Sequence, residues 1–302
     1  MFDLLGFFIF IIVLFFYLHI QYEYKMNNDL EVLTSQINNK ENFEDICNLK
    51  QPTLFKYYNN VYKKKFLYNS FINKYKIFDF NIRNITISNK NNKLLHFPLN
   101  ISKAKKLFQN DKKGIYITEN NVELVNEISF EKNINYLSSI LEPSFSLNKH
   151  IDLLSGSENS FTPLKYNLNS RFFLYIPNGS VEIKLIPPKF SSYLNEYKDY
   201  DNYEFVSDIN IWNTSKNNIK NIKKIKQLSF KFEEDSILYI PPHWWYSMKF
   251  NKENLVLSLK YSTFINILAN LKNYLIYYLQ KQNINEKTNN VLEINKKKVL
   301  KK

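Results

Sequence analysis

The stretch "YIPPHWWYSMKF", Tyr239 to Phe250, is the segment of the chain that best indicates the fold. Two adjacent prolines predict a turn, and the two tryptophans begin a run with the composition of a β-strand. A turn that leads into a strand in this way is typical of enzymes whose strands carry site residues. The residue after the tryptophans is Tyr246.

Short β-type runs continue on both sides of this stretch, from His150 to Ser262. They are "HIDLLSG", "FTPLKYN", "RFFLYI", "VEIKLIPP", "KFEEDSILYIPP", "WWYSMKF" and "LVLSLKYS", with turns such as "PNGS" and "FNKEN" between several of them. This spacing predicts an antiparallel sandwich or barrel. The long polar segment 189–227 resembles an insertion. Upstream, the pattern predicts a short helix that Pro52 ends and a later helix with Ser102 as its N-cap.

The composition favours one substantial domain with appendages. The chain has 302 residues, is 44% hydrophobic and carries a net charge of +13. Almost all of the positive charge comes from lysine, and Arg83 and Arg171 are the only two arginines in the sequence. Because proteins that read bases favour arginine side chains, we do not expect a nucleic-acid partner. A single cysteine, Cys47, excludes an internal disulfide and a thiolate zinc site, and we expect it to be buried.

The N-terminal run "LLGFFIFIIVLFFYLHI", Leu4 to Ile20, is almost unbroken in its apolar character. As a helix it would extend about 26 Å, just enough to cross a bilayer core. A cleaved signal peptide is the alternative, but no small-residue cleavage site follows and no basic region precedes the run. We predict a retained single-pass anchor over residues 1–25, then a linker over 26–41 and the main domain over 42–262. The charges that flank the run do not indicate its orientation.

The C-terminal region has a helical apolar stripe that runs from Phe264 to Leu279. We predict an amphipathic helix over residues 263–282 that packs on the domain or pairs with the same helix of a second copy. A basic tail, "INKKKVLKK", closes the segment 283–302.

Five blocks of the sequence occur in an order that resembles a known family. They are "LKQPTLFKYY", "GIYITENN", "GSENSFTPLKYNLNSRFFLYI", "VEIKLIPPKF" and "DSILYIPPHWWYSMKF". In this order they resemble the cupin-like, JmjC-type branch of the double-stranded β-helix proteins. The resemblance implies a mainly β fold, a double-stranded β-helix with flanking helices. The whole chain also resembles membrane-anchored cupin-like proteins of large DNA viruses of eukaryotes, which implies a viral membrane or a host endomembrane.

Active members of that family bind iron(II) through two histidines and one carboxylate, and they use 2-oxoglutarate as cosubstrate. Their motif Thr-Pro-x-His-x-Asp corresponds here to "TPLKYN", which puts Lys165 and Asn167 in ligand positions and Tyr246 in the third. An ammonium has no lone pair for a metal, an amide is a weak neutral ligand, and a phenol ionises only near pH 10. The resemblance therefore implies a frame that has lost its metal ligands. The ammonium of Lys165 either reaches out to water or occupies the iron position, bonded to Asn167 and Tyr246.

The rest of the family's pocket is also changed. The lysine that holds 2-oxoglutarate falls at Ser180 or Val181 in this chain, so it too is missing. Thr162, which hydrogen-bonds a cosubstrate carboxylate in related enzymes, is present. Trp244 and Trp245 could bind a ligand by stacking at the barrel mouth, although tryptophans at this point in the family also pack the barrel.

A second set of residues matches a facial triad by pattern alone, namely His150, Asp152 and His243. Three functions are therefore open. The first is a membrane-anchored, metal-free module without catalysis that binds a protein or small ligand. The second is an iron(II)/2-oxoglutarate hydroxylase that uses this displaced triad. The third is a module that binds a small anion or a carbohydrate.

Overall fold

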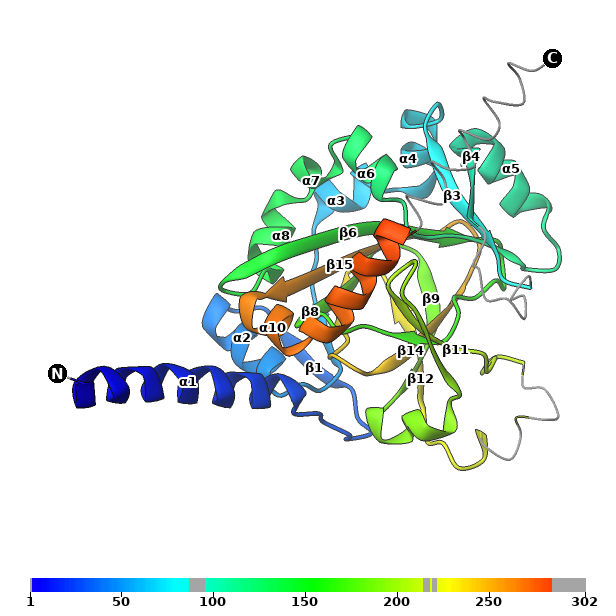
Figure 1. Cartoon of the computed structure of the whole chain (residues 1–302). Helices are drawn as coiled ribbons and strands as arrows, with labels where there is room; N and C mark the ends of the chain where they lie inside the picture. Colours follow the sequence, from blue (N-terminus) through cyan, green and yellow to red (C-terminus); the bar gives the residue numbers. More distant parts are fainter. Residues whose placement is uncertain (1, 87–95, 214–217, 219–221, 284–302) are drawn as a thin grey trace, which may run out of the picture.

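The structure is a computed structural model that describes residues 2–86, 96–213, 218 and 222–283. Its centre is two β-sheets packed face to face, with helices on the outside of the larger one (Figure 1). The basic tail from residue 284 onward lies outside the described residues.

The larger sheet has nine strands, and every pair is antiparallel except β1 with β2. In spatial order they are β1 (Leu33–Gln36), β2 (Thr53–Lys56), β13 (Ser236–Tyr239), β8 (Arg171–Asn178), β15 (Leu255–Thr263), β6 (Ser146–Gly156), β5 (Tyr116–Thr118), β3 (Asp79–Asn84) and β4 (His96–Asn100). The segment 26–41, expected as a linker, thus contributes the edge strand β1.

The smaller sheet has six strands. In spatial order they are β10 (Glu196–Asp199), β11 (Glu204–Ser207), β7 (Lys165–Tyr166), β14 (Trp245–Phe250), β9 (Ser180–Ile186) and β12 (Leu228–Glu233). The polar segment that resembled an insertion supplies the hairpin β10–β11, which extends this sheet next to β7.

The chain alternates between the sheets, because β6, β8, β13 and β15 belong to the larger one and β7, β9 and β14 to the smaller one. This alternation wraps the strands around a common interior, as the sequence resemblance implied. Fully buried Phe172 and Leu174 of β8 face Met248 and Phe250 of β14 across that interior. The apolar residues of the two inner faces form one core between the sheets.

A second core lies between the outer face of the larger sheet and the helices. Phe43 and Phe130 from helices pack there with Phe173 and Tyr261 from the sheet. The helices between β1 and β6 are α2 (Lys40–Asn48), α3 (Asn60–Lys65), α4 (Tyr68–Lys74), α5 (Ile101–Asn110), α6 (Val122–Glu127), α7 (Phe130–Asn133) and α8 (Asn135–Leu141), and the 3-10 helix η1 (Pro188–Tyr193) follows β9. The N-cap of α5 is Asn100, whose Oδ1 accepts the Ser102 N–H, and not Ser102 as expected.

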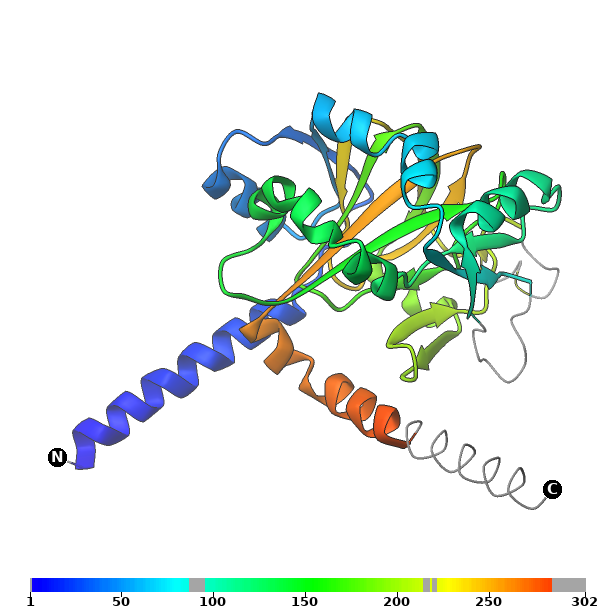
Figure 2. The same cartoon turned by 90° about the horizontal axis from the view of Figure 1, so that it is seen from above.

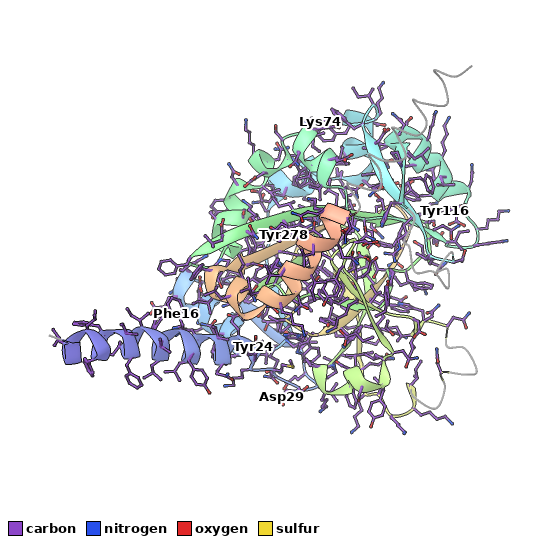
Figure 3. The ribbon with its side chains drawn as sticks, viewed as in Figure 1. Phe16, Tyr24, Asp29, Lys74, Tyr116 and Tyr278 are labelled. Atoms are coloured by element: carbon purple, nitrogen blue, oxygen red, sulfur yellow. The ribbon has the colours of Figure 1, made fainter. Side chains whose placement is uncertain are left out.

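Two helical segments leave the domain on the same side (Figure 2). They are α1 (Phe2–Tyr24) and the C-terminal region, where α10 (Phe264–Ala269) is followed after a turn by helical residues 271–283. Phe16 and Tyr278 mark the two in Figure 3.

The C-terminal helix meets the domain through a face that the apolar stripe did not indicate. Tyr274 stacks on Tyr203, with ring centroids 5.1 Å apart, and Tyr277 also contacts that ring. Much of the stripe, including Leu271 and Leu275, is exposed instead.

Candidate functional site

The three residues that we predict at the family's ligand positions lie together on or beside the smaller sheet. Lys165 on β7 is the register partner of Tyr246 on β14, so both side chains project to the same side of the sheet. Asn167 follows two residues after Lys165, and its Nδ2 donates to the Tyr246 hydroxyl at 3.3 Å. Lys165 and Tyr246 are buried.

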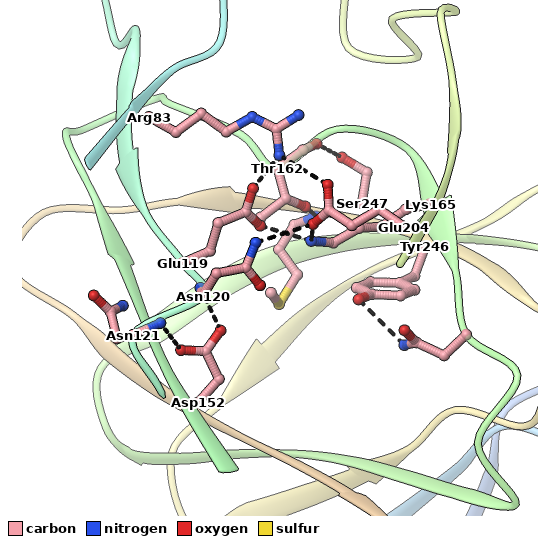
Figure 4. A network of polar contacts seen from close by, with 12 residues as sticks. Arg83, Glu119, Asn120, Asn121, Asp152, Thr162, Lys165, Glu204, Tyr246 and Ser247 are labelled. Carbon is pink, nitrogen blue, oxygen red and sulfur yellow. Dashed lines mark hydrogen bonds and ion pairs between the residues drawn. The ribbon is translucent and has the colours of Figure 1, made fainter. Parts of the chain in front are cut away.

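The ammonium of Lys165 is held by two carboxylates. Its Nζ donates to Glu119 Oε2 at 2.6 Å and to Glu204 Oε1 at 3.3 Å. Arg83 pairs with Glu119 as well and lies 3.6 Å from Glu204 Oε2. All four side chains are buried, and Figure 4 shows them as one network. Lys165 therefore takes neither of the two expected positions, because it points neither to water nor to Asn167 and Tyr246.

Each member of this charge cluster comes from a different part of the chain. Arg83 lies on β3, Glu119 directly follows β5, and Glu204 begins β11 in the segment that resembled an insertion. Sequence reasoning missed all three. One signal was available, because Arg83 is one of two arginines in a chain that otherwise uses lysine, and both arginines are buried. Arginine suits buried ion pairs because its charge is delocalised and weakly hydrated.

The cluster keeps its four groups ionised. Burial raises the pKa of Glu119, but Lys165 and Arg83 outweigh this effect and the pKa lies well below its usual value. The pKa of Glu204 is lowered for the same reason. Burial also disfavours the charged form of Lys165, yet Glu119 and Glu204 hold its pKa above the ordinary value. Two positive and two negative charges thus form a neutral set.

This arrangement does not fit an iron(II) ion. The predicted position of the first ligand holds an ammonium that donates its protons to carboxylates, and the other two predicted positions hold an amide and a phenol hydrogen-bonded to each other. Burial raises the pKa of Tyr246 to about 12, so the phenol stays neutral. None of these groups offers an anionic or imidazole donor to a divalent cation.

The displaced triad does not form a metal site either. The carboxylate of Asp152 accepts the backbone N–H groups of Asn120 and Asn121, both at 2.8 Å. The His243 ring lies 5.9 Å from the ring of Tyr166, and its own backbone N–H donates to Asn167. In the described part of the chain no three His, Cys, Asp or Glu side chains are grouped closely enough to hold a metal.

The four residues expected to line a ligand pocket, which are Thr162, Val181, Trp244 and Trp245, are hydrogen-bonded or buried within the domain. Thr162 Oγ1 accepts the Met248 N–H at 2.9 Å, and Val181 is fully buried in the core. Trp244 Nε1 donates to Asn27 O, and Trp245 Nε1 donates to Ser191 Oγ. Both tryptophans are fully buried, which agrees with the packing interpretation of the pair.

A cavity of about 320 Å³ lies beside the charge cluster. Lys165 and Glu204 form part of its wall, together with His150 of β6 and Lys260 of β15. Its remaining walls are rich in asparagine amides and in tyrosine rings, the latter including Tyr203, Tyr274 and Tyr277. This volume is at the lower end of the range for small-molecule sites.

Comparison with known proteins supports the fold and names the family. No curated protein matches the chain. The sequence model of a family described as a cupin-like domain matches residues 25–292, which is most of the chain and includes every strand of both sheets. That match agrees with the alternation of strands between two sheets and with the order of the sequence blocks. The chain belongs to the cupin-like domain family.

Proposed function

We propose that this protein is a non-catalytic, membrane-anchored cupin-like binding module whose ion cluster replaces the metal centre. The observation that carries the proposal is the Lys165 ammonium held between Glu119 and Glu204, at the position of an iron ligand in active relatives. Lys165 and Arg83 together neutralise these two carboxylates, which leaves no net negative charge there to attract a divalent cation.

The anchor in this proposal is α1. Residues Leu4–Tyr24 form one helix that is long and apolar enough to cross a membrane, and none of it is buried in the domain. A signal sequence passes the same test of length and composition. Support for a retained anchor comes from the end of α1, which is fixed to the domain. Tyr22 OH donates to Asn48 O at 2.8 Å, and Asn266 Nδ2 donates to Glu23 Oε2 at 2.9 Å. The membrane in question would be viral or a host endomembrane.

The partner that we propose for the outer face of the C-terminal helix is a second copy of the chain, paired through residues 264–279. Leu271, Leu275, Tyr278 and Leu279 are exposed on this helix. Copies held by α1 in one membrane would also share one orientation. Disulfide crosslinking of a Leu275→Cys variant in membranes should give a dimer on gels, and a chain that stays monomeric would exclude this pairing.

The main test uses the full chain purified in detergent. We expect that iron(II), added anaerobically and followed by desalting, leaves no stoichiometric iron on the protein. We also expect no release of succinate from 2-oxoglutarate above the level without protein. Stoichiometric iron together with succinate release would show a hydroxylase with displaced ligands. The same experiment on a His150→Ala variant would then test whether the displaced triad supplies that site.

A further inference from the structure

Lys260 is a cation in the cavity for which the fold provides no counter-charge. On β15 it is the register partner of His150 on β6 and of Phe172 on β8, so the three side chains project to one side. That side is the interior, because Phe172 packs on Tyr246 with ring centroids 5.0 Å apart. The Lys260 Nζ lies 5.7 Å from the centre of the Phe172 ring.

The charged neighbours of Lys260 are all committed elsewhere. Glu119 and Glu204 bind Lys165 and Arg83, and Asp152 accepts backbone N–H groups from Asn120 and Asn121. Within the described residues, Lys260 forms no ion pair and no hydrogen bond. By contrast, the neighbouring Lys149 is paired with Glu131 at 2.5 Å.

His150 adds a second donor beside this ammonium. Burial, reinforced by the charge of Lys260, lowers the pKa of His150 to about 4, so the imidazole is neutral at physiological pH and can donate one N–H. Burial and the charge of Lys165 lower the pKa of Lys260 to about 8. Cross-strand partners hold their Cβ atoms about 5 Å apart, which suits two donors that share one oxyanion.

We propose that Lys260 and His150 form the oxyanion site of a small organic acid whose ring lies against the tyrosine wall of the cavity. Tyr203, Tyr274 and Tyr277 supply that wall, and their flat faces suit an aromatic or sugar ring. The asparagine amides around the cavity provide further neutral donors and acceptors. This inference deepens the proposed function by naming the ligand class of the binding module.

The test uses the full chain in detergent with EDTA present and benzoate as the probe, followed by saturation-transfer NMR and by a titration. Benzyl alcohol is the neutral probe of the same shape, and inorganic phosphate is the oxyanion without a ring. We expect benzoate to bind more tightly than either. Lys260→Met should weaken benzoate binding about tenfold or more, because it removes a charged hydrogen bond. Lys231→Met, which removes an exposed lysine of β12, should leave binding unchanged.

The pH dependence gives a second readout that needs no variant. Benzoate stays ionised between pH 7 and pH 9, whereas Lys260 loses its proton in this range, so affinity should fall as the pH rises. His150 is already neutral throughout that range, and the groups of the charge cluster do not titrate there. Benzyl alcohol should show no such trend.

Three results would overturn the inference. They are equal binding of benzoate and benzyl alcohol, unchanged benzoate binding in a folded Lys260→Met variant, and affinity that is independent of pH. If Lys260→Met does not fold, Lys260→Gln and the pH profile of the unaltered protein decide the question. Because EDTA removes free metal, a failure here is distinct from a finding that the chain binds iron, which would contradict the proposed function instead.

Discussion

The most direct test of the charge cluster is Lys165→Met, which removes the ammonium and keeps most of the side-chain volume. Glu119 and Glu204 would then share Arg83 alone, and one buried negative charge would lack a partner. Breaking a buried ion pair in this way typically costs about 3–5 kcal/mol of unfolding free energy. For a domain of this size, that loss corresponds to a fall in melting temperature of about 6–20 °C.

The pH dependence of the loss follows from the direction of each shift. In the unaltered protein the pKa values of both carboxyls are lowered, so their contribution is present above the unfolded value and is lost as the pH falls through the folded one. In the variant, burial without Lys165 favours the protonated form of one carboxyl. That group gains a proton on folding, so the difference in stability between variant and parent should shrink below about pH 5.

The double variant Lys165→Met, Glu204→Gln is the matched rescue. It leaves Arg83 paired with Glu119, restores a neutral cluster and should recover most of the lost stability. Lys231→Met, at an exposed ion pair with Glu233, is the control and should change the stability by less than about 1 kcal/mol. Thermal unfolding at about pH 4 and about pH 7.5 measures all four proteins, because the difference should shrink at the lower pH. The reasoning fails if Lys165→Met melts within about 2 °C of the parent, or if the double variant is no more stable than the single one.

Three further predictions concern the site, the sheet and the anchor. The triple change Lys165→His, Asn167→Asp, Tyr246→His should raise cobalt(II) affinity clearly above that of the parent, as followed by visible absorption, and an unchanged affinity in a folded variant would refute our placement of the motif. Gly156→Ala should lower the unfolding free energy by about 1–3 kcal/mol, because the new Cβ would lie 2.8 Å from the ring of Phe250, and unchanged thermal unfolding would contradict this contact. The run Leu4 to Ile20 should stay in the membrane pellet after a carbonate wash, and an N-terminus that begins after Ile20 would show that it is cleaved.

Much of the fold could be predicted from the sequence because the relevant signals are local. The continuous apolar run in "RFFLYI" and the alternation in "VEIKLIPP" predict strands that bury both faces and one face, and β8 and β9 occur at these places. The loss of the family's ligands at Lys165, Asn167 and Tyr246 stays a prediction, which depends on residue types in a recognisable motif. The apolar stripe from 264 to 279 was a weaker guide. The stripe located the C-terminal helices but not the face of the helix that packs on the domain. That face carries Tyr274 and Tyr277, because their rings pack against the ring of Tyr203.

The sequence by itself thus determined the family, the strand pattern and the apolar N-terminal run, and it predicted the loss of the usual metal ligands. Only the tertiary structure decided what Lys165 does instead. Its partners Glu119 and Glu204 lie 46 and 39 residues away, on segments that meet it through strand edges. Periodicity reports which side of a strand faces the core, but it carries no information about which distant strands become neighbours. Lys260 is a similar case, because a lysine on a strand ordinarily extends to water, and its position in the cavity follows from how β6, β8 and β15 pair.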